Sequence, residues 1–89
     1  MLLPIPNPDV IHKAVGDGAV LLSTKDEVYY GLNAVGTCIW ERLSPVVTEL
    51  DDLCASVSKV YPDVDPQTIR RDAEQLIGDL LAHGLLCPR

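Results

Sequence analysis

Along the first third of the chain, short apolar stretches alternate with turn residues, which is typical of strands in a small β-sheet. Val10–Val15 and Ala19–Ser23 are predicted as two strands, and Gly16–Gly18 between them allows the positive φ of a tight turn. The polar residues Thr24–Asp26 then separate the second strand from a third over Glu27–Leu32. Because both connections are short, we expect an antiparallel meander in the order one, two, three.

From Asn33 onward, apolar residues recur at every third or fourth position, which predicts helices. Asn33 is a favourable N-cap for a first helix, and Ser44-Pro45 is expected to end that helix. Thr48 is predicted to open a second helix, which Pro62–Val64 ends. The middle of the chain therefore holds two helices joined by a short connection.

A third helix is predicted to begin after Asp65, because Asp65 is a good N-cap and Pro66 suits the first helical position. We expect it to run to His83, where Gly84 suits the left-handed cap, and Leu85-Leu86 to fold back onto the core. The fold class is thus α+β, a three-stranded antiparallel sheet followed by three helices. Two helices joined by a tight turn and backed by a small sheet form a winged-helix-like layout.

The 89 residues are enough for one domain, which we assign to residues 10–89. The proline-rich residues 1–9 are predicted as an extended arm, because proline can neither donate a backbone hydrogen bond nor continue a helix. The chain has no Phe, and Trp40 is its one Trp. We therefore expect Trp40 to be the single large anchor of the core.

The formal net charge is −6, from 7 basic and 13 acidic residues. Proteins that bind nucleic acids gain most of their affinity from Lys and Arg, and anionic membranes attract the same residues. The charge therefore argues against nucleic acid and membrane partners and favours a protein, peptide or small molecule. The sequence shows no signal peptide and no run of roughly 20 apolar residues for a membrane helix, so we expect a cytoplasmic protein.

No catalytic or metal-binding constellation is evident in the sequence. Cys38, Cys54 and Cys87 form no C-x-x-C pair, and His12 and His83 lie far apart along the chain. Nothing near either His supplies the orienting group or the oxyanion donors that a Cys–His pair needs. We expect no metal, no cofactor and no enzymatic activity.

The edge of the predicted third strand is the most informative feature for function. The first and third strands are both edges of a meander, and the first carries His12 and Lys13 behind a proline-rich segment, which discourages pairing. The third strand has no Lys and no Pro, and adjacent Tyr side chains on it point to opposite faces. We expect a peptide to add a strand there, although two Tyr that merely cover the sheet are an alternative. The residues expected to contact it are Glu27, Val28, Tyr29, Tyr30 and Gly31.

The third helix offers a second wall for such a peptide. Arg70, Glu74, Ile77 and Leu81 are spaced four, three and four residues apart, so they share one face beside the core stripe. Two apolar and two charged residues there suit an amphipathic peptide, and the alternative is an ordinary core boundary with a solvated rim. The residues of this helix expected to contact the peptide are Arg70, Ala73, Glu74, Ile77 and Leu81.

The order and spacing of several short motifs resemble the PqqD-like family, whose members include the RiPP recognition elements that bind leader peptides of ribosomally made, modified peptides. The match runs from about residue 10 to 86. The motif residues are Gly18–Leu22, Tyr29–Asn33, Val35-Gly36, Ile39-Trp40, Leu43, Tyr61, Val64-Asp65, Asp72, Leu80 and Gly84–Leu86.

The resemblance implies that a precursor's leader peptide adds a strand to the third strand and fills a groove against the third helix. It also implies a cytosolic bacterial setting, a separate leader peptidase of cysteine-protease type and a cyclase. A domain of this size is most similar to the stand-alone recognition proteins of lasso-peptide biosynthesis. A PqqD-type peptide chaperone for a radical enzyme and a winged-helix DNA-binding regulator are the alternatives. The motif residues Leu32, Asn33, Gly36 and Trp40 are expected to be structural.

Overall fold

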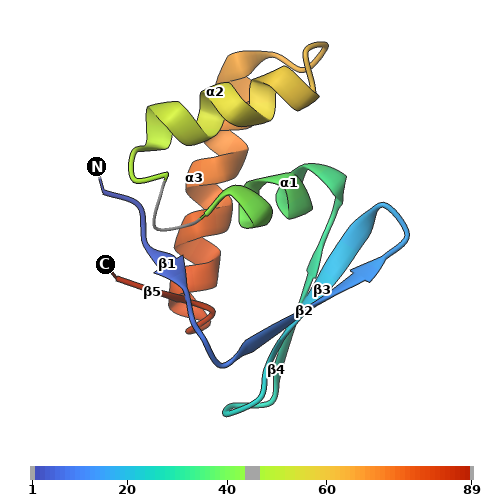
Figure 1. The fold of residues 1–89 in the computed structure, drawn as a ribbon, viewed down its shortest axis with the longest axis vertical. Coiled ribbons are helices and arrows are strands. Elements are labelled where there is room, and N and C mark those ends of the chain that lie inside the picture. The colour runs from blue at the N-terminus through green and yellow to red at the C-terminus, as the bar shows by residue number, and fades with distance from the viewer. Residues whose placement is uncertain (1, 44–46, 89) are drawn as a thin grey trace.

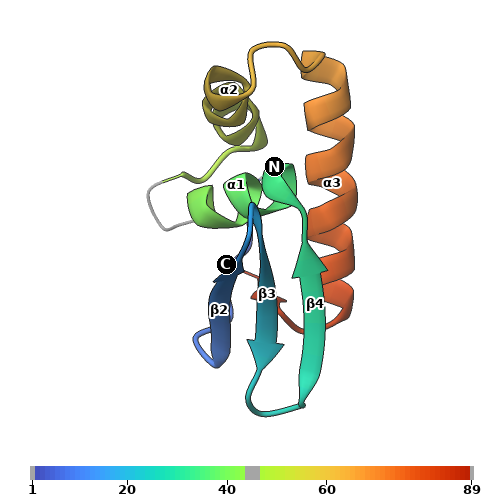
Figure 2. The ribbon, with the colours of Figure 1, turned by 90° about the vertical axis from the view of Figure 1, so that its right-hand side faces the viewer.

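The computed structural model describes residues 2–43 and 47–88, and its sheet is the predicted meander. Strands β2 (Val10–Val15), β3 (Gly18–Ser23) and β4 (Val28–Leu32) pair antiparallel in the order β2-β3-β4 (Figure 2). These strands differ from the predicted ones only at Gly18, which joins β3, and at Glu27, which lies before β4. Both β2 and β4 are therefore edges of the sheet.

Three helices follow the sheet, which confirms the α+β fold class. They are α1 (Ala34–Arg42), α2 (Leu50–Val60) and α3 (Pro66–Ala82). Helix α1 packs against β3, and α2 and α3 pack against each other and against α1. Figures 1 and 2 together show α3 on one side of the sheet, running along β4 and away from β2. This arrangement places the long helix next to one edge of the sheet only.

The predicted caps of α1 and α3 are present. The side-chain oxygen of Asn33 accepts a hydrogen bond from the Gly36 amide at 2.7 Å, and that of Asp65 accepts one from the Gln67 amide at 2.8 Å. At the other end of α3, Gly84 has a φ of +72°, the left-handed conformation that favours glycine. Local sequence chemistry thus sets both the end of the sheet and the limits of the long helix.

The start of α2 differs from the prediction, because its N-cap is Glu49 and not Thr48. The backbone oxygen of Thr48 instead accepts a hydrogen bond from the Leu3 amide at 2.8 Å. A contact with a distant segment thus takes the place of the predicted cap. The predicted stop of α1 at Ser44-Pro45 lies outside the described residues.

The proline-rich segment is extended, but it packs on the domain. Its strand β1 (Ile5–Pro6) pairs antiparallel with β5 (Leu86–Cys87) near the end of the chain, as Figure 1 shows. Leu3 is fully buried, and the Asn7 side-chain amide donates a hydrogen bond to the Gly84 carbonyl at 2.9 Å. The two ends of the chain therefore close one side of the core together.

One apolar core lies between the inner face of the sheet and the helices. Trp40 is its largest side chain and is 8% exposed, in agreement with the role predicted for it. Alternate residues of β3 enter the core, as expected for a strand covered on one face. The core residues are Leu3, Ala19, Leu21, Leu32, Cys38, Ile39, Trp40, Leu43, Leu50, Leu53, Val57, Ile69, Ala73, Ile77, Leu80, Leu85 and Leu86.

Candidate functional site

The outer edge of β4 is open within the described residues. β4 pairs with β3 on one side, and no described strand pairs with its other side. Tyr29 is 71% exposed and Gly31 is also exposed, so side chains do not close this edge. Glu27 precedes the strand in a turn, where its φ is +54° and its amide donates to the Ser23 carbonyl at 2.9 Å. The open ladder thus begins at Val28.

A groove runs beside this edge, between β4, the start of α1 and the side of α3. Its cavity volume is about 290 Å³. Apolar and polar side chains both line it, and the exposed polar side chains of α3, Asp72, Gln75 and Asp79, form its rim. The residues that line it are Tyr30, Gly31, Leu32, Asn33, Val35, Gly36, Ile39, Asp72, Gln75, Leu76 and Asp79.

Tyr30 connects the two walls of the groove. Its hydroxyl donates a hydrogen bond to Oδ2 of Asp79 at 3.4 Å, and its ring meets the His83 ring edge-on with centroids 5.6 Å apart. Burial raises the pKa of the Tyr30 hydroxyl, and the Asp79 charge and hydrogen bond raise it further. Tyr29 points away from these groups and stays exposed, so only one of the two adjacent Tyr side chains packs against the core, as predicted.

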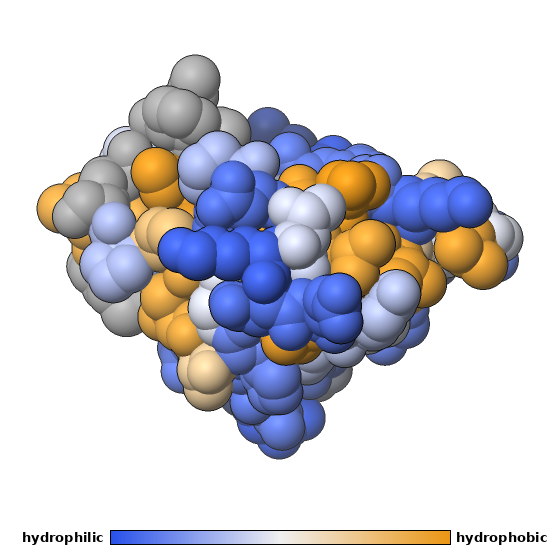
Figure 3. Space-filling model, turned by 90° about the horizontal axis from the view of Figure 1, so that it is seen from below, coloured by the Kyte–Doolittle hydropathy of each residue, from blue (hydrophilic) through white to orange (hydrophobic). Residues whose placement is uncertain are grey.

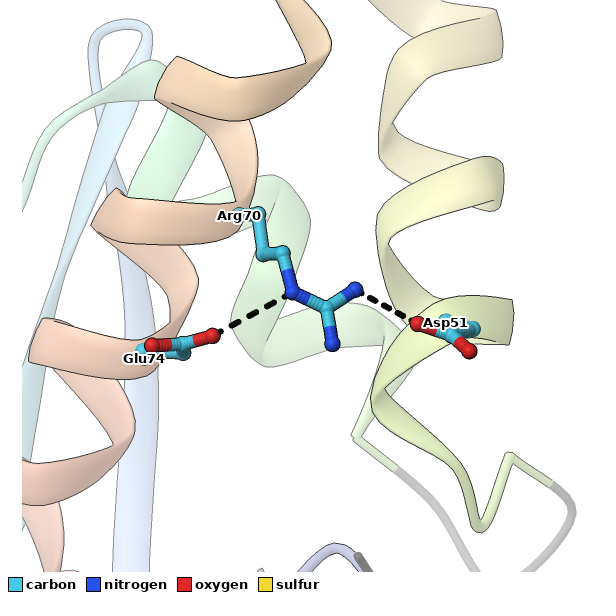
Figure 4. A network of polar contacts seen from close by, with 3 residues as sticks. All are labelled: Asp51, Arg70 and Glu74. Carbon is cyan, nitrogen blue, oxygen red and sulfur yellow. Dashed lines mark hydrogen bonds and ion pairs between the residues drawn. The ribbon is translucent and has the colours of Figure 1, made fainter.

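The face of α3 predicted from the sequence is not the one that borders the groove. Arg70 contacts Asp51 of α2 at 2.5 Å and Glu74 at 3.3 Å, as Figure 4 shows. The guanidinium hydrogen bond and charge hold the pKa of the Asp51 carboxyl below its ordinary value. Arg70 and Glu74 therefore face α2, on the side of α3 away from β4.

The other predicted residues of α3 also lie outside the groove. Ala73 and Ile77 are buried in the core, and Leu81 is partly exposed but does not line the groove. At about 100° per residue, Asp72 and Asp79 lie on the opposite border of the core stripe from Arg70 and Glu74. Asp72, Leu76 and Asp79 have the same helical spacing, so the sequence pattern marks both borders. Only the packing of α3 on β4 shows which border faces the open edge.

The cysteines and the ionisable groups form no reactive cluster in the parts of the chain that the structure describes. Burial raises the pKa of the Cys38 and Cys54 thiols, which favours the neutral, unreactive form. No group of three metal-ligating side chains occurs in residues 2–43 and 47–88. In the same residues, no helix has the length and apolar character that crossing a membrane requires.

The outer face of the sheet carries a second exposed surface. Ile11, Leu22 and Tyr29 are direct cross-strand neighbours on it, and Ile11 and Tyr29 are both more than half exposed. Figure 3, which shows the molecule from below, has hydrophilic side chains at the centre and apolar ones on both sides of them. This face shares Tyr29 with the open edge, so the two surfaces are continuous.

Comparison with known proteins supports the resemblance found in the sequence. A family model described as coenzyme PQQ synthesis protein D (PqqD) matches residues 18–86. The solved structure of TbiB1 in complex with the TbiA(β) leader peptide matches with a TM-score of 0.77 and 28% sequence identity, over 92% of this chain and 93% of the other. Comparison with curated proteins gives no match. The chain thus belongs to the PqqD family, and it is a non-catalytic protein of that family.

Proposed function

We propose that this protein is a RiPP recognition element that captures the leader of a precursor peptide by adding it as a strand to β4. The observation that carries the proposal is the open edge of β4 beside a groove formed with α3. The similarity to TbiB1, a protein solved with a leader peptide, supports the same class of ligand. The charge of −6 further favours a peptide over nucleic acid.

In this geometry, the backbone and the side chains of the peptide contribute differently to binding. β4 has 5 residues, so a paired peptide segment is about 17 Å long at roughly 3.3 Å per residue. Its main-chain hydrogen bonds supply affinity whatever its sequence. Its side chains alternate between the groove and the outer face of the sheet, so sequence specificity comes from those pointing into the groove.

The proposed contact residues follow from this geometry. Val28, Tyr29, Tyr30 and Gly31 offer the backbone of the open edge, as the sequence predicted. On α3, the residues that line the groove replace the predicted Arg70, Ala73, Glu74, Ile77 and Leu81. They are Asp72, Gln75, Leu76 and Asp79.

The captured leader is then presented to separate processing enzymes in the cytoplasm. These are a leader peptidase of cysteine-protease type and a cyclase, as in lasso-peptide biosynthesis, the pathway that the sequence motifs favour. A leader on β4 leaves the β2 edge and the outer-face residue Ile11 accessible to a second protein. Cleavage by another chain fits a protein in which burial favours the neutral form of the Cys38 and Cys54 thiols.

The decisive experiment compares a synthetic leader peptide with duplex DNA as ligands of the full chain. Any short precursor gene found beside the gene for this protein supplies the leader sequence. We expect the leader to bind and to slow hydrogen exchange at amides of β4 but not of β2. DNA binding that weakens steeply with salt, without leader binding, would instead show a winged-helix DNA-binding regulator. Protection at β2 alone would place the peptide on the other edge.

A further inference from the structure

We infer that the groove selects a leader segment in which an apolar residue is flanked, two positions to each side, by Lys or Arg. This specificity rests on the proposed function, because it requires a peptide strand on β4. It names the chemical class of peptide that this groove accepts.

The rim of the groove on α3 is acidic. Asp72 and Asp79 both line it, and none of its described lining residues is Lys or Arg. The hydrogen bond from Tyr30 reaches one oxygen of Asp79 at a long 3.4 Å, which leaves the other oxygen open to a ligand. Arg70 is held on the opposite side of α3 by Asp51 and Glu74, so it does not neutralise this rim. A peptide strand laid in the groove therefore meets two carboxylates and no cationic lining residue.

An apolar lining residue, Leu76, lies between the two carboxylates along α3. Leu76 is partly buried against the core, and Val35 and Ile39 line the same groove. Along α3, Leu76 comes four residues after Asp72 and three before Asp79. An apolar peptide side chain at this point buries Leu76 further, whereas an acidic one is both desolvated and repelled.

The spacing along α3 fits the spacing of side chains along a strand. Asp72 and Asp79 are seven residues apart, or about 10.5 Å along the helix axis. Side chains on one face of a strand recur every second residue, so three in a row span about 13 Å. Lys and Arg side chains are long and flexible, so they span the difference between the length along the helix and the length along the strand. α3 runs along β4 in Figure 2, so the middle side chain meets Leu76 and the outer two meet Asp72 and Asp79.

This pattern is the same when read in either direction. A basic, apolar, basic arrangement at alternate positions fits the groove whether the leader pairs parallel or antiparallel to β4. The inference therefore does not depend on the direction of the added strand. Exposed ion pairs of this kind each change an affinity roughly two- to fivefold, so the two together change it about 4- to 25-fold.

The test uses a displayed library of random 12-residue peptides, selected on the full chain at low salt. We expect the enriched peptides to carry Lys or Arg two positions from an apolar residue. One enriched peptide is then titrated against the wild type and against the double variant Asp72→Asn/Asp79→Asn. The variant should bind about 4- to 25-fold more weakly, and replacing the peptide's cations by Gln should weaken wild-type binding equally. Added salt should weaken wild-type binding and leave the variant nearly unchanged.

The matched control is Asp17→Asn/Asp63→Asn, which changes the net charge equally at exposed residues outside the groove. An equal loss in this control would trace the effect to net charge and overturn the inference. Enriched peptides without the cation pattern would overturn it too, while the proposed function stands. Absence of any enriched peptide would overturn both. If the double variant does not fold, the Gln peptides on the wild type still decide the question.

Discussion

The hydroxyl of Tyr30 lies 3.4 Å from Oδ2 of Asp79, and this contact joins the open strand to the long helix across the groove. The two residues are 49 positions apart in sequence, so the contact depends on the packing of α3 against β4. The Tyr30 ring also meets the His83 ring edge-on, and the adjacent Tyr29 lies on the opposite face of the strand. The contact thus links β4 and α3 at the groove that both of them line.

Tyr30→Phe tests this contact through its pH dependence. The pKa of Tyr30 is raised in the folded state, so its contribution to stability is fully present below the ordinary Tyr pKa of about 10. This contribution is lost as the pH rises through the folded-state pKa. At neutral pH we expect the variant to lose less than about 1 kcal/mol of unfolding free energy. Urea unfolding from pH 8 to 11 should show a smaller alkaline loss for the variant than for the wild type.

Tyr29→Phe is the matched control for this comparison, because Tyr29 is exposed and lies on the other face of the same strand. Its alkaline loss should resemble that of the wild type. If Tyr29→Phe and Tyr30→Phe give the same pH profile, the Tyr30–Asp79 contact does not contribute to stability.

Arg70→Ala distinguishes the two faces of α3. Arg70 bonds Asp51 and Glu74 on the side of α2, so its loss should leave leader affinity unchanged and raise the pKa of the Asp51 carboxyl toward the ordinary 3.8. Because the folded-state pKa of Asp51 is lowered, the stabilisation it provides is present above pH 3.8 and lost at lower pH. The wild type and the variant should therefore differ less in stability as the pH falls. NMR titration measures the pKa of Asp51, and titration with the leader peptide measures its affinity. A large loss of leader affinity would show that Arg70 belongs to the binding site.

The sequence predicts most of this fold because its signals are local. A short apolar run bounded by turn residues marks β3, and Asn33 and Asp65 cap helices through hydrogen bonds to amides two or three residues away. The predicted β4 edge follows from the order of the strands and the absence of Lys and Pro. Each of these inferences needs only neighbouring residues and the antiparallel order.

The features that the sequence did not predict depend on long-range packing. Pairing of β1 with β5 joins opposite ends of the chain, and no local pattern indicates it. The Leu3 amide donates a hydrogen bond to the Thr48 carbonyl, which is another contact between distant segments, and the N-cap of α2 is Glu49 and not Thr48. The sequence could not indicate which border of the α3 core stripe faces the groove, because both borders share the same helical spacing.

Leu3→Ala tests whether the N-terminal segment is part of the folded domain. The Leu3 side chain is fully buried, so we expect the variant to lose roughly 2–5 kcal/mol of unfolding free energy. Leu2 is the neighbouring residue and is 62% exposed, so Leu2→Ala should change stability by less than about 0.5 kcal/mol. Urea denaturation of the two variants gives the comparison directly. Equal and small losses would show that the burial of Leu3 does not stabilise the folded domain.

A proline scan of β4 tests strand addition itself. Proline removes one backbone N–H and fixes φ, and alternate residues of an edge strand direct their N–H outward or toward the neighbouring strand. Val28→Pro, Tyr29→Pro and Tyr30→Pro should therefore have unequal effects. At least one should abolish leader binding while keeping most of the stability, because it removes an outward N–H. A proline that breaks a bond to β3 should lower stability as well.

Lys13→Pro on β2 is the control for this scan, because Lys13 lies on the other edge of the same sheet. If this variant folds, its leader affinity should stay within about tenfold of the wild type, or about 1.4 kcal/mol. Circular dichroism and thermal melting identify the folded variants, and calorimetric titration with the leader peptide gives the affinities. Normal binding by all three β4 variants, together with lost binding by Lys13→Pro, would move the peptide to the β2 edge. In that case the groove beside α3, which lies along β4, has no part in leader recognition.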